Sequence, residues 1–251
     1  MISVCIATYN GSRYILEQLT WILKQLQEDD EVIVSDDGST DNTLDIIRNI
    51  NDRRIKIVEK TVDNPHNSSL ANNFENALSH AKGDYIFLSD QDDVWMPNKI
   101  AVMMKNLDKY HCVVSDATVT DSELNTTYES FYKMMKVKSG RLYNLLWHNG
   151  YTGCCMAFRR DVLDRAMPFP DNIPMHDIWI GNVAAFFFDV HFIADKLIYF
   201  RRHKNATSCN GRGSKYSIRK QFIFRWQIVK DIMKMLKNKK INIIKGRQSR
   251  K

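Results

Sequence analysis

Apolar runs of strand length alternate with helix-spaced apolar residues through residues 1–90, and this rhythm limits the folds open to the chain. Between the runs, apolar residues recur at helical spacing, and Ser12 is placed to cap the first helix. Strands that alternate with helices in this way form a mostly parallel sheet with helices on both faces. We therefore expect an α/β, Rossmann-like fold. The runs are residues 2–7, 31–35, 55–59 and 85–88.

The pattern continues less regularly after Pro97. Before Pro97, helical spacing also predicts a helix over residues 70–81. After it, helical spacing predicts helices over 100–107 and 178–187, and apolar runs predict strands over 112–115, 152–158 and 191–199. Residues 118–140 are polar and irregular, so we expect a loop or lid there.

Charge divides the chain unevenly. From Arg212 onward there are 14 Lys or Arg residues against one acid, a net charge of +13, whereas residues 1–211 hold 22 basic and 28 acidic residues, a net −6. At 251 residues with 44% hydrophobic content, the chain is long for one domain and short for two. We expect one α/β domain over 1–211 and a basic tail over 212–251.

The tail has the pattern of a basic amphipathic helix. Over residues 217–236, apolar side chains such as Phe222 and Trp226 interleave with Lys and Arg. Helices of this kind lie on anionic membranes, so we expect a membrane surface as partner. The alternative is a helix that packs on the domain with a solvated basic face. No nucleic-acid partner is expected, because no recognised nucleic-acid motif accompanies the charge.

The compartment follows from what the sequence does not contain. No basic residue precedes the first apolar run, which argues against a secretory signal, and no apolar stretch approaches the roughly 20 residues that span a bilayer. The five cysteines are odd in number and form no CxxC pair, which favours reduced thiols. With the basic tail, this predicts a cytoplasmic protein held peripherally on the inner face of the cytoplasmic membrane.

Three polar clusters each follow an apolar run directly. They are Thr8-Tyr9-Asn10, Asp36-Asp37 and Asp90-Gln91-Asp92. In open α/β sheets the ligand sits beyond the carboxyl ends of the strands, so the clusters are expected to meet at one side of the sheet.

The carboxylates of Asp90, Asp92 and Asp93 need a cation to offset their repulsion. Hard oxygen donors suit Mg²⁺ or Mn²⁺, and Mg²⁺ completes its shell with phosphate oxygens and water, so a diphosphate is the natural co-ligand. An isolated Asp-x-Asp is more often a solvated acidic turn. Its place after a buried strand, beside two other polar clusters, favours a metal site here.

The three clusters, in the contexts Ala7-Thr8-Tyr9-Asn10, Asp36-Asp37-Gly38-Ser39-Thr40-Asp41 and Phe87-Leu88-Ser89-Asp90-Gln91-Asp92-Asp93-Val94-Trp95, resemble the motifs of glycosyltransferase family two. That family consists of inverting enzymes with the GT-A fold, and the resemblance covers about residues 1–205. His176-Asp177-Ile178-Trp179 and the run from Tyr199 to Asn205 are similar to the rhamnosyltransferase-type branch of bacterial polysaccharide synthesis. The resemblance implies a donor such as dTDP-rhamnose or a UDP-sugar, and a saccharide or polyprenyl-diphosphate-linked acceptor.

The resemblance also assigns donor-side roles. It implies that Tyr9 stacks on a pyrimidine base, that Asp37 accepts the N3–H of that base, and that Asp36 shapes the turn. Asp92 becomes the main metal ligand, and Asp90 contacts ribose or metal. The remaining donor-side residues that it implies are Thr8, Asn10, Asn73 (where many relatives carry an arginine nearby) and Gly153.

On the acceptor side the resemblance implies that Asp177 is the general base, because inversion requires the acceptor hydroxyl to lose its proton as it attacks. His176 orients Asp177 or contacts the acceptor, and Trp95 and Trp179 stack on sugar rings. His203 matches a metal or diphosphate ligand position. Arg201, Arg202 and Lys204 offset phosphate charge. For Asp93 the alternative to a place in the metal group is a charge that serves the dipole at a helix start.

Two other functions stay open at this point. Asp90-Gln91-Asp92-Asp93-Val94 also fits a haloacid-dehalogenase-type phosphatase with Asp90 as nucleophile, although that class carries the motif on its first strand and leaves Asp36-Asp37 unexplained. The second open function is a non-catalytic module that binds a sugar nucleotide. A dinucleotide dehydrogenase is not supported, because the chain has no GxGxxG motif.

Overall fold

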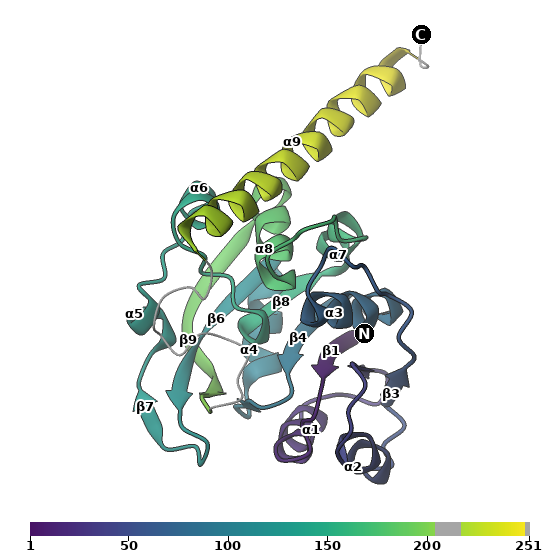
Figure 1. The fold of residues 1–251 in the computed structure, drawn as a ribbon, viewed down its shortest axis with the longest axis vertical. Coiled ribbons are helices and arrows are strands. Elements are labelled where there is room, and N and C mark those ends of the chain that lie inside the picture. Colours follow the sequence, from purple (N-terminus) through teal and green to yellow (C-terminus); the bar gives the residue numbers. More distant parts are fainter. Residues whose placement is uncertain (204–216, 249–251) are drawn as a thin grey trace.

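The computed structural model describes residues 1–203 and 217–248. Its centre is a curled sheet with the strand order β3-β2-β1-β4-β8-β6-β9-β5, and β7 pairs with β6 at the side (Figure 1). The first four strands are parallel, which confirms the predicted α/β rhythm. Their bounds are β1 (Ile2–Thr8), β2 (Glu31–Asp36), β3 (Ile55–Val58) and β4 (Tyr85–Asp90).

Amphipathic helices connect these strands, as the spacing of apolar residues predicts. They are α1 (Ile15–Leu23), α2 (Thr43–Asn49), α3 (Ser69–His80) and α4 (Lys99–Leu107). The hydroxyl of Ser68 accepts a hydrogen bond from the Ala71 backbone N–H and so caps α3. The expected cap at Ser12 is wrong, because α1 begins after Tyr14 with no side-chain cap.

The second half of the sheet is mixed. β8 (Met156–Arg159) runs antiparallel between β4 and β6 (Cys112–Thr120), and β6 is parallel to β9 (Val190–Arg201). The short β5 (Val94–Trp95) pairs antiparallel with β9. The strand expected from residue 152 begins only at Met156, because Gly153–Cys155 form the 3₁₀ turn η1.

The expected loop over residues 118–140 is wrong in large part. β6 runs on to Thr120, because β9 pairs with it along its whole length, and β7 (Thr126–Tyr128) and α5 (Phe131–Met135) follow. Asp116 organises the start of α5 by accepting hydrogen bonds from the Ser130 hydroxyl, at 2.5 Å, and the Tyr132 backbone N–H, at 2.9 Å. The polar residues of this segment therefore bond to each other rather than forming an open lid.

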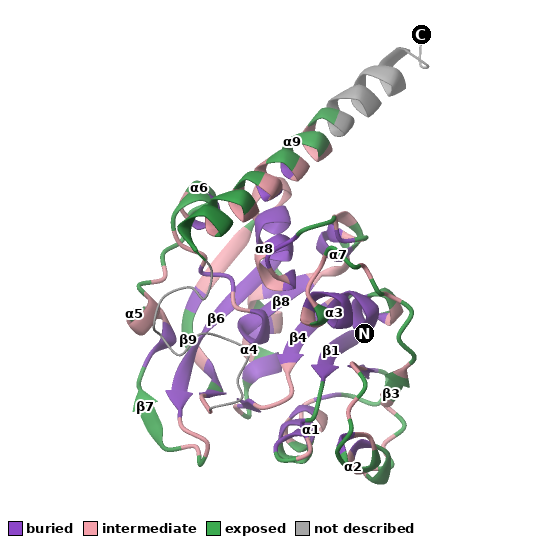
Figure 2. Ribbon diagram, in the orientation of Figure 1, coloured by how far each residue is buried: buried purple, intermediate pink, exposed green. Residues whose placement is uncertain are grey.

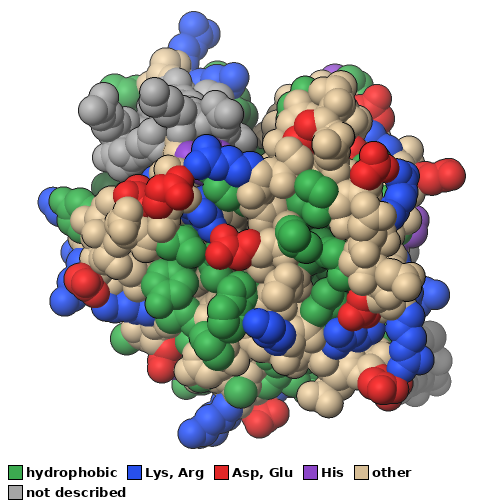
Figure 3. Space-filling view, turned by 90° about the horizontal axis from the view of Figure 1, so that it is seen from below, with side chains coloured by type: hydrophobic (Ala, Val, Ile, Leu, Met, Phe, Trp, Pro, Cys, Tyr) green, Lys and Arg blue, Asp and Glu red, His purple; other side chains and the backbone are tan. Residues whose placement is uncertain are grey.

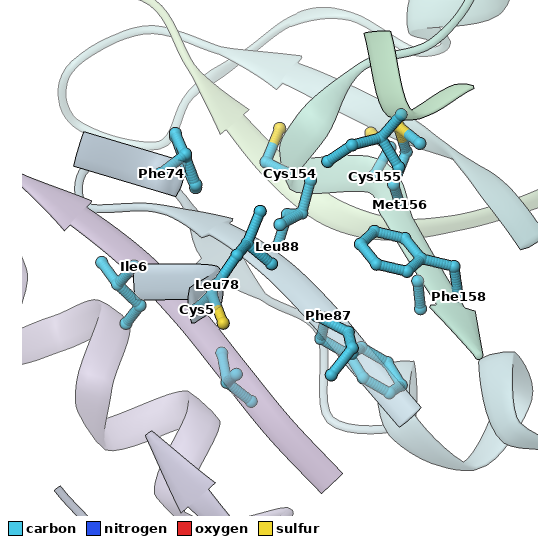
Figure 4. Close-up of a cluster of buried hydrophobic side chains, with 14 of the residues drawn as sticks. Cys5, Ile6, Phe74, Leu78, Phe87, Leu88, Cys154, Cys155, Met156 and Phe158 are labelled. Carbon is cyan, nitrogen blue, oxygen red and sulfur yellow. The ribbon is translucent and has the colours of Figure 1, made fainter. Parts of the chain in front are cut away.

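The core lies between the sheet and its helices. Figure 4 shows Ile6 of β1, Leu78 of α3 and Phe87 of β4 packed with residues of η1 and β8. Four cysteines, Cys5, Cys112, Cys154 and Cys155, are buried free thiols, and Cys209 lies outside the described residues. Burial raises the pKa of Cys112 to about 12, so this thiol packs as a small apolar side chain.

The remaining helices lie toward the end of the molecule from which β1 and β4 point away (Figure 1). They are α6 (Arg141–Leu146), α7 (Arg160–Ala166), α8 (His176–Phe187) and α9 (Ile218–Gln248). Ile228 and Ile232 of α9 are buried, so part of the basic tail packs on the domain (Figure 2). Within the described part of the chain, no helix is both long and apolar enough to cross a bilayer.

Candidate active site at the carboxyl ends of the strands

The three polar clusters meet where β1, β2 and β4 end, as their positions in the sequence predict. In the parallel ladders Thr8 lies opposite Asp36, and Ala7 lies opposite Asp90. Figure 3 looks onto this end of the molecule and shows acidic side chains in the middle of the face, with hydrophobic and basic side chains around them. We call this region the carboxyl edge.

Gln91, the residue between the two aspartates, ties the first cluster to the third. Its side-chain amide donates to the Tyr9 carbonyl at 2.9 Å and accepts from the Tyr9 backbone N–H at 3.0 Å. No role is expected for Gln91 from the sequence alone. The Tyr9 ring itself is 55% exposed, so its face is free for a base to stack on.

Replacing Gly11 by alanine is expected to break the two hydrogen bonds between the Gln91 side chain and the Tyr9 backbone. A Cβ at Gly11 lies 2.2 Å from the Gln91 Oε1, so the Gln91 side chain must move and release Tyr9. We expect the fold to survive, because the clash is with the end of a flexible side chain, and the KM for donor to rise roughly tenfold through misplacement of Tyr9. Donor titration of G11A beside the neighbouring Ser12→Ala variant checks this. An unchanged KM in G11A shows that Gln91 does not position Tyr9.

Asp36 shapes the turn after β2, as expected. Its Oδ2 accepts the backbone N–H groups of Gly38 and Ser39, and its Oδ1 accepts the Thr8 hydroxyl at 2.8 Å. Thr8 is 1% exposed, so the expected direct contact with the donor is wrong: Thr8 holds the turn. Asn10, in the left-handed region at φ 46°, stays exposed and accepts from the Thr40 N–H through its Oδ1.

Asp37 lies next to the end of β1, where its backbone N–H donates to the Thr8 carbonyl at 2.9 Å. Its carboxylate pairs with the Lys60 ammonium at 2.6 Å and accepts from the Ser69 hydroxyl. Burial works in the opposite direction, but these two partners hold the pKa of Asp37 below its usual range. Asp37 is therefore an ionised acceptor next to the strand end that leads into Tyr9.

Asn73 supports the end of β1 from α3. Its amide donates to the Thr8 carbonyl at 3.1 Å, and the residue is 2% exposed. The Asn73 Oδ1 has no hydrogen-bond partner among the described residues, and its contact with the nucleotide stays a prediction. The hydrogen bond from the Asn73 amide N–H fixes the strand end from which Tyr9 projects.

The acidic run after β4 forms a compact group of donor atoms. One atom each of Asp90, Asp93 and Cys154 lies within 4.8 Å of the others. Burial, followed by the charges of Asp92 and Asp177, raises the pKa of Asp90 to about 7. Burial and the neighbouring Asp92 and Asp90 raise the pKa of Asp93 well above its usual range.

Asp93 belongs to the acidic group, and the alternative role for it, a helix-start charge, is wrong, because the strand β5 follows it. Asp93 is 1% exposed and accepts the Arg201 backbone N–H at 3.0 Å, because β9 passes directly over it. Cys154, for which no role is expected from the sequence, contributes its thiol to this group. Lys99 lies beneath, fully buried, and donates to the Cys154 carbonyl at 2.8 Å.

Asp92 is set apart from that group and pairs with His203. The distance from His203 Nε2 to Asp92 Oδ2 is 2.8 Å, so the two residues form one donor set after β4 and β9. Arg202 lies near enough to lower the pKa of Asp90. Lys204, which is expected beside them, lies outside the described residues.

Arg201 is a structural residue. Its guanidinium donates to the Asp92 carbonyl at 2.8 Å, to the Ser122 carbonyl at 2.5 Å and to the Glu17 carboxylate at 2.6 Å. Its side chain is 4% exposed. The expected role in offsetting phosphate charge is therefore wrong: Arg201 is fully engaged in fixing the backbone of the acidic run.

The donor set suits a divalent cation. Burial, and after it the charges of the neighbouring aspartates, raise the pKa values of Asp90 and Asp93, and a bound cation offsets both effects. Carboxylate oxygens with an imidazole nitrogen suit Mn²⁺, and the oxygens alone suit Mg²⁺. The residues present thus fit the metal that the sequence predicts.

Asp177 stands in the first turn of α8, facing the same group. Its Oδ2 accepts the Gly153 backbone N–H at 3.1 Å and its Oδ1 accepts the Ile178 N–H at 2.7 Å. Burial raises the pKa of Asp177 to about 6. Its charge acts on Asp90, which places the two carboxyls in one site. The structure therefore brings Gly153, Asp177 and Asp90 together as expected.

Three expected acceptor residues are buried. Trp95 is 0% exposed and Trp179 is 2% exposed, with the Trp179 indole N–H donating to the Ala166 carbonyl at 2.9 Å. His176 is 2% exposed and stacks on Phe74 with ring centroids 3.7 Å apart. Burial lowers the pKa of His176 to about 3, so the ring is neutral. The stacking roles expected for Trp95 and Trp179 are wrong, because their rings are part of the core, whereas the role of His176 in orienting Asp177 stays a prediction.

Comparison with known proteins gives a family match. Residues 3–166 match the family model described as glycosyl transferase family 2. An uncharacterized glycosyltransferase of Nostoc is 26% identical over 216 residues, which cover 80% of this chain and 65% of the relative. The Escherichia coli UDP-Glc:alpha-D-GlcNAc-diphosphoundecaprenol beta-1,3-glucosyltransferase WfgD is 28% identical over 84% of this chain and 80% of its own. The Shigella flexneri dTDP-rhamnosyl transferase RfbG is 28% identical over 79% and 72%.

Solved structures show the same architecture. Staphylococcus aureus TarS 1-349 in complex with UDP-GlcNAc superposes with a TM-score of 0.67 at 20% identity, covering 93% of this chain and 66% of that one. The mannosyltransferase PcManGT of Pyrobaculum calidifontis, in complex with GDP-Man and Mn²⁺, gives 0.59 at 24% identity over 81% and 57%. The chain thus spans slightly less than two thirds of the Nostoc relative and of the TarS chain. The fold is the GT-A fold.

Proposed function

Because the chain belongs to glycosyl transferase family 2, we propose that it transfers a sugar, with inversion at the anomeric carbon, from a nucleoside diphosphate to a saccharide acceptor. The observation that carries the proposal is the meeting of Asp177, Asp90 and Asp92 at the carboxyl edge, next to the exposed Tyr9 ring. A general base, a cation site and a stacking platform are the parts that such a reaction needs.

The donor binds with its base between Tyr9 and Asp37. Tyr9 offers an exposed ring, and Asp37 offers an ionised acceptor for the N3–H of a pyrimidine. Asn10, exposed at the same turn, lies where the ribose leaves the base. The backbone around Tyr9 is held by Gln91 and Asn73, so the platform is formed before the donor arrives.

The general base is Asp177. A carboxyl with a pKa of about 6 is mostly ionised at neutral pH and is a stronger base than an exposed aspartate. Its two backbone hydrogen bonds, from Gly153 and Ile178, fix its direction while leaving further lone pairs to accept the proton of the acceptor hydroxyl.

Asp92, Asp90 and His203 would hold the divalent cation, with Asp92 as the main ligand. Mn²⁺ or Mg²⁺ bound there offsets the charge of the departing diphosphate. Arg202, which already acts on Asp90, adds a fixed positive charge to the same region.

For the substrates, the named relatives support a rhamnose or hexose donor and a lipid-linked acceptor. RfbG is named as a dTDP-rhamnosyl transferase, and WfgD as an enzyme that acts on a diphosphoundecaprenol-linked sugar. We place this chain in the same kind of reaction, cell-surface polysaccharide synthesis on a polyprenyl-diphosphate acceptor at the inner face of the cytoplasmic membrane. An acceptor of this kind keeps the reaction at a lipid surface.

The metal and donor proposals are tested by thermal unfolding. A ligand present at 100 times its Kd stabilises the folded state by about 2.7 kcal/mol, which corresponds to a rise in Tm of roughly 5–10 °C for a chain of this size. We expect this rise with Mn²⁺ or Mg²⁺ plus UDP or dTDP, and a much smaller one with nucleotide alone. Asp92→Asn is expected to remove the metal-dependent part.

The same metals, tested with each nucleotide sugar in an assay for donor hydrolysis, separate an enzyme from a binding module. Binding without turnover, with every acceptor supplied, favours the module. A Tm that no metal and nucleotide pair changes contradicts the donor site. The phosphatase alternative has lost its basis, because the family match covers the acidic run and a nucleophilic Asp90 would have to ionise beside Asp92 and Asp177.

A further inference from the structure

Helix α9 presents two apolar faces, and only one of them is covered. Ile228 and Ile232 are buried where α9 packs on α6 and α8. A second set falls on one stripe of the helix at 100° per residue and is between 50% and 82% exposed. That set is Ile218, Phe222, Trp226 and Met233.

Helix α6 extends the exposed stripe. Leu142 and Trp147 are 58% and 70% exposed, and the Arg225 guanidinium of α9 donates to the Trp147 carbonyl at 2.9 Å. The two helices are therefore in contact at Trp147, the residue that follows α6, and we call the exposed apolar residues of both together the α6–α9 surface. Monomeric proteins rarely leave several large apolar side chains, aromatic rings included, side by side in water without a partner.

Basic side chains border this surface. Arg219, Lys230 and Lys234 are exposed and fall, at helical spacing, on the flank of the stripe that faces away from the body. The tail as a whole has 14 Lys or Arg residues and one acid. Apolar and aromatic side chains flanked by Lys and Arg on one helix match the boundary between acyl chains and anionic headgroups.

We propose that the α6–α9 surface docks on an anionic lipid bilayer, with the α9 stripe entering the headgroup region. A second copy of the chain fits less well, because its equally basic tail would approach a like charge. A nucleic acid would satisfy the charge but would leave the apolar stripe in water.

The α6–α9 surface lies away from the carboxyl edge, so docking there leaves the donor site open, and this step alone rests on the proposed function. α6 and α9 lie at the end of the molecule opposite to the one toward which β1 and β4 point (Figure 1). A bilayer at this surface leaves the carboxyl edge facing water, where a nucleotide sugar is dissolved.

The test is cosedimentation of the full chain with vesicles of phosphatidylcholine, alone or mixed with phosphatidylglycerol. We expect binding to the mixed vesicles only. The double variant Phe222→Ser/Trp226→Ser is expected to lower the partition coefficient roughly tenfold or more, because two exposed aromatic rings no longer enter the bilayer. Tyr128→Ser, which removes a ring 57% exposed on β7, is the matched control and is expected to bind like the wild type.

A second variant tests the charge. Arg219→Gln/Lys230→Gln/Lys234→Gln is expected to lose roughly 100-fold in affinity for the mixed vesicles, at about 1 kcal/mol for each charge. The proposal is overturned if the wild type binds neither vesicle, or if the aromatic double variant binds as the wild type does. It is also overturned if the wild type is a dimer that the double variant converts to a monomer, or if it prefers duplex DNA to vesicles. Nucleotide binding, measured on the same samples, is expected to be unchanged in every variant, so the two proposals fail separately.

Discussion

Asp177→Asn is expected to lower kcat for sugar transfer about 1,000-fold while leaving donor KM near the wild-type value. Removal of a positioned general base typically costs between about 100-fold and 10,000-fold, and the amide cannot take up the proton of the acceptor hydroxyl. The donor site at Tyr9 and Asp37 does not involve this carboxyl, which is why donor binding is expected to survive. Initial-rate kinetics with donor and acceptor varied separately measure both quantities.

The pH profile gives the same prediction a second readout. Because the pKa of Asp177 is raised to about 6, the ionised base is lost as the pH falls through that value, so kcat/KM is expected to fall below pH 6. The residual kcat/KM of D177N is expected not to fall in this way below pH 6. Asp164→Asn, an exposed aspartate of α7, is the matched control. Full transfer activity in D177N places the base elsewhere.

Arg201→Met is expected to lower the free energy of unfolding by about 3 kcal/mol, because it leaves buried acceptors without their charged donor. For a chain of this size that is a fall in Tm of roughly 6–12 °C. The Asp92 and Ser122 carbonyls both lose a hydrogen bond, and the Tyr14 ring loses the guanidinium that lies 4.5 Å from its centre. Chemical denaturation, with thermal unfolding beside it, measures the effect.

A surface ion pair provides the comparison for Arg201. Arg48 pairs with Asp45 at 3.2 Å on α2, with 59% of its side chain exposed, so Arg48→Met is expected to cost less than about 0.5 kcal/mol. Equal losses in the two variants would show that Arg201 does not hold the acidic run. If the run is held as described, R201M also weakens the metal-dependent rise in Tm, because the backbone of Asp92 is no longer fixed.

The parts of the fold that local pattern decides were predictable from the sequence. Alternating periods identify β1 to β4 and their helices, and the rule that parallel strands end together brings Asp36, Asp90 and the Tyr9 turn to one side of the sheet. Asp177 needed more than local pattern, because the resemblance to a family selected it among many acidic residues. The structure places it against Gly153, 24 residues away in sequence.

The features that the sequence does not predict depend on contacts between distant segments of the chain. Asp93 is polar in sequence, yet β9 arrives 108 residues later and buries it under Arg201. Lys99 is buried because η1, 55 residues farther on, offers it a carbonyl. Trp95 and Trp179 are aromatic residues beside the motifs, and composition does not tell a ring that faces a sugar from one that fills the core.

The acidic run also makes metal loading a proton-releasing event. Burial and the charge of Asp92 raise the pKa of Asp90 to about 7 and that of Asp93 well above its usual range, so both carboxyls hold their protons more tightly than an exposed aspartate does. Carboxylates must lose these protons to bind a cation, so the affinity for metal rises with pH over the range in which Asp90 titrates. The charge of Asp177 acts on Asp90, and this coupling is reciprocal: a cation at the run makes Asp177 easier to ionise. The base is therefore most fully ionised when the metal is present to receive the donor diphosphate.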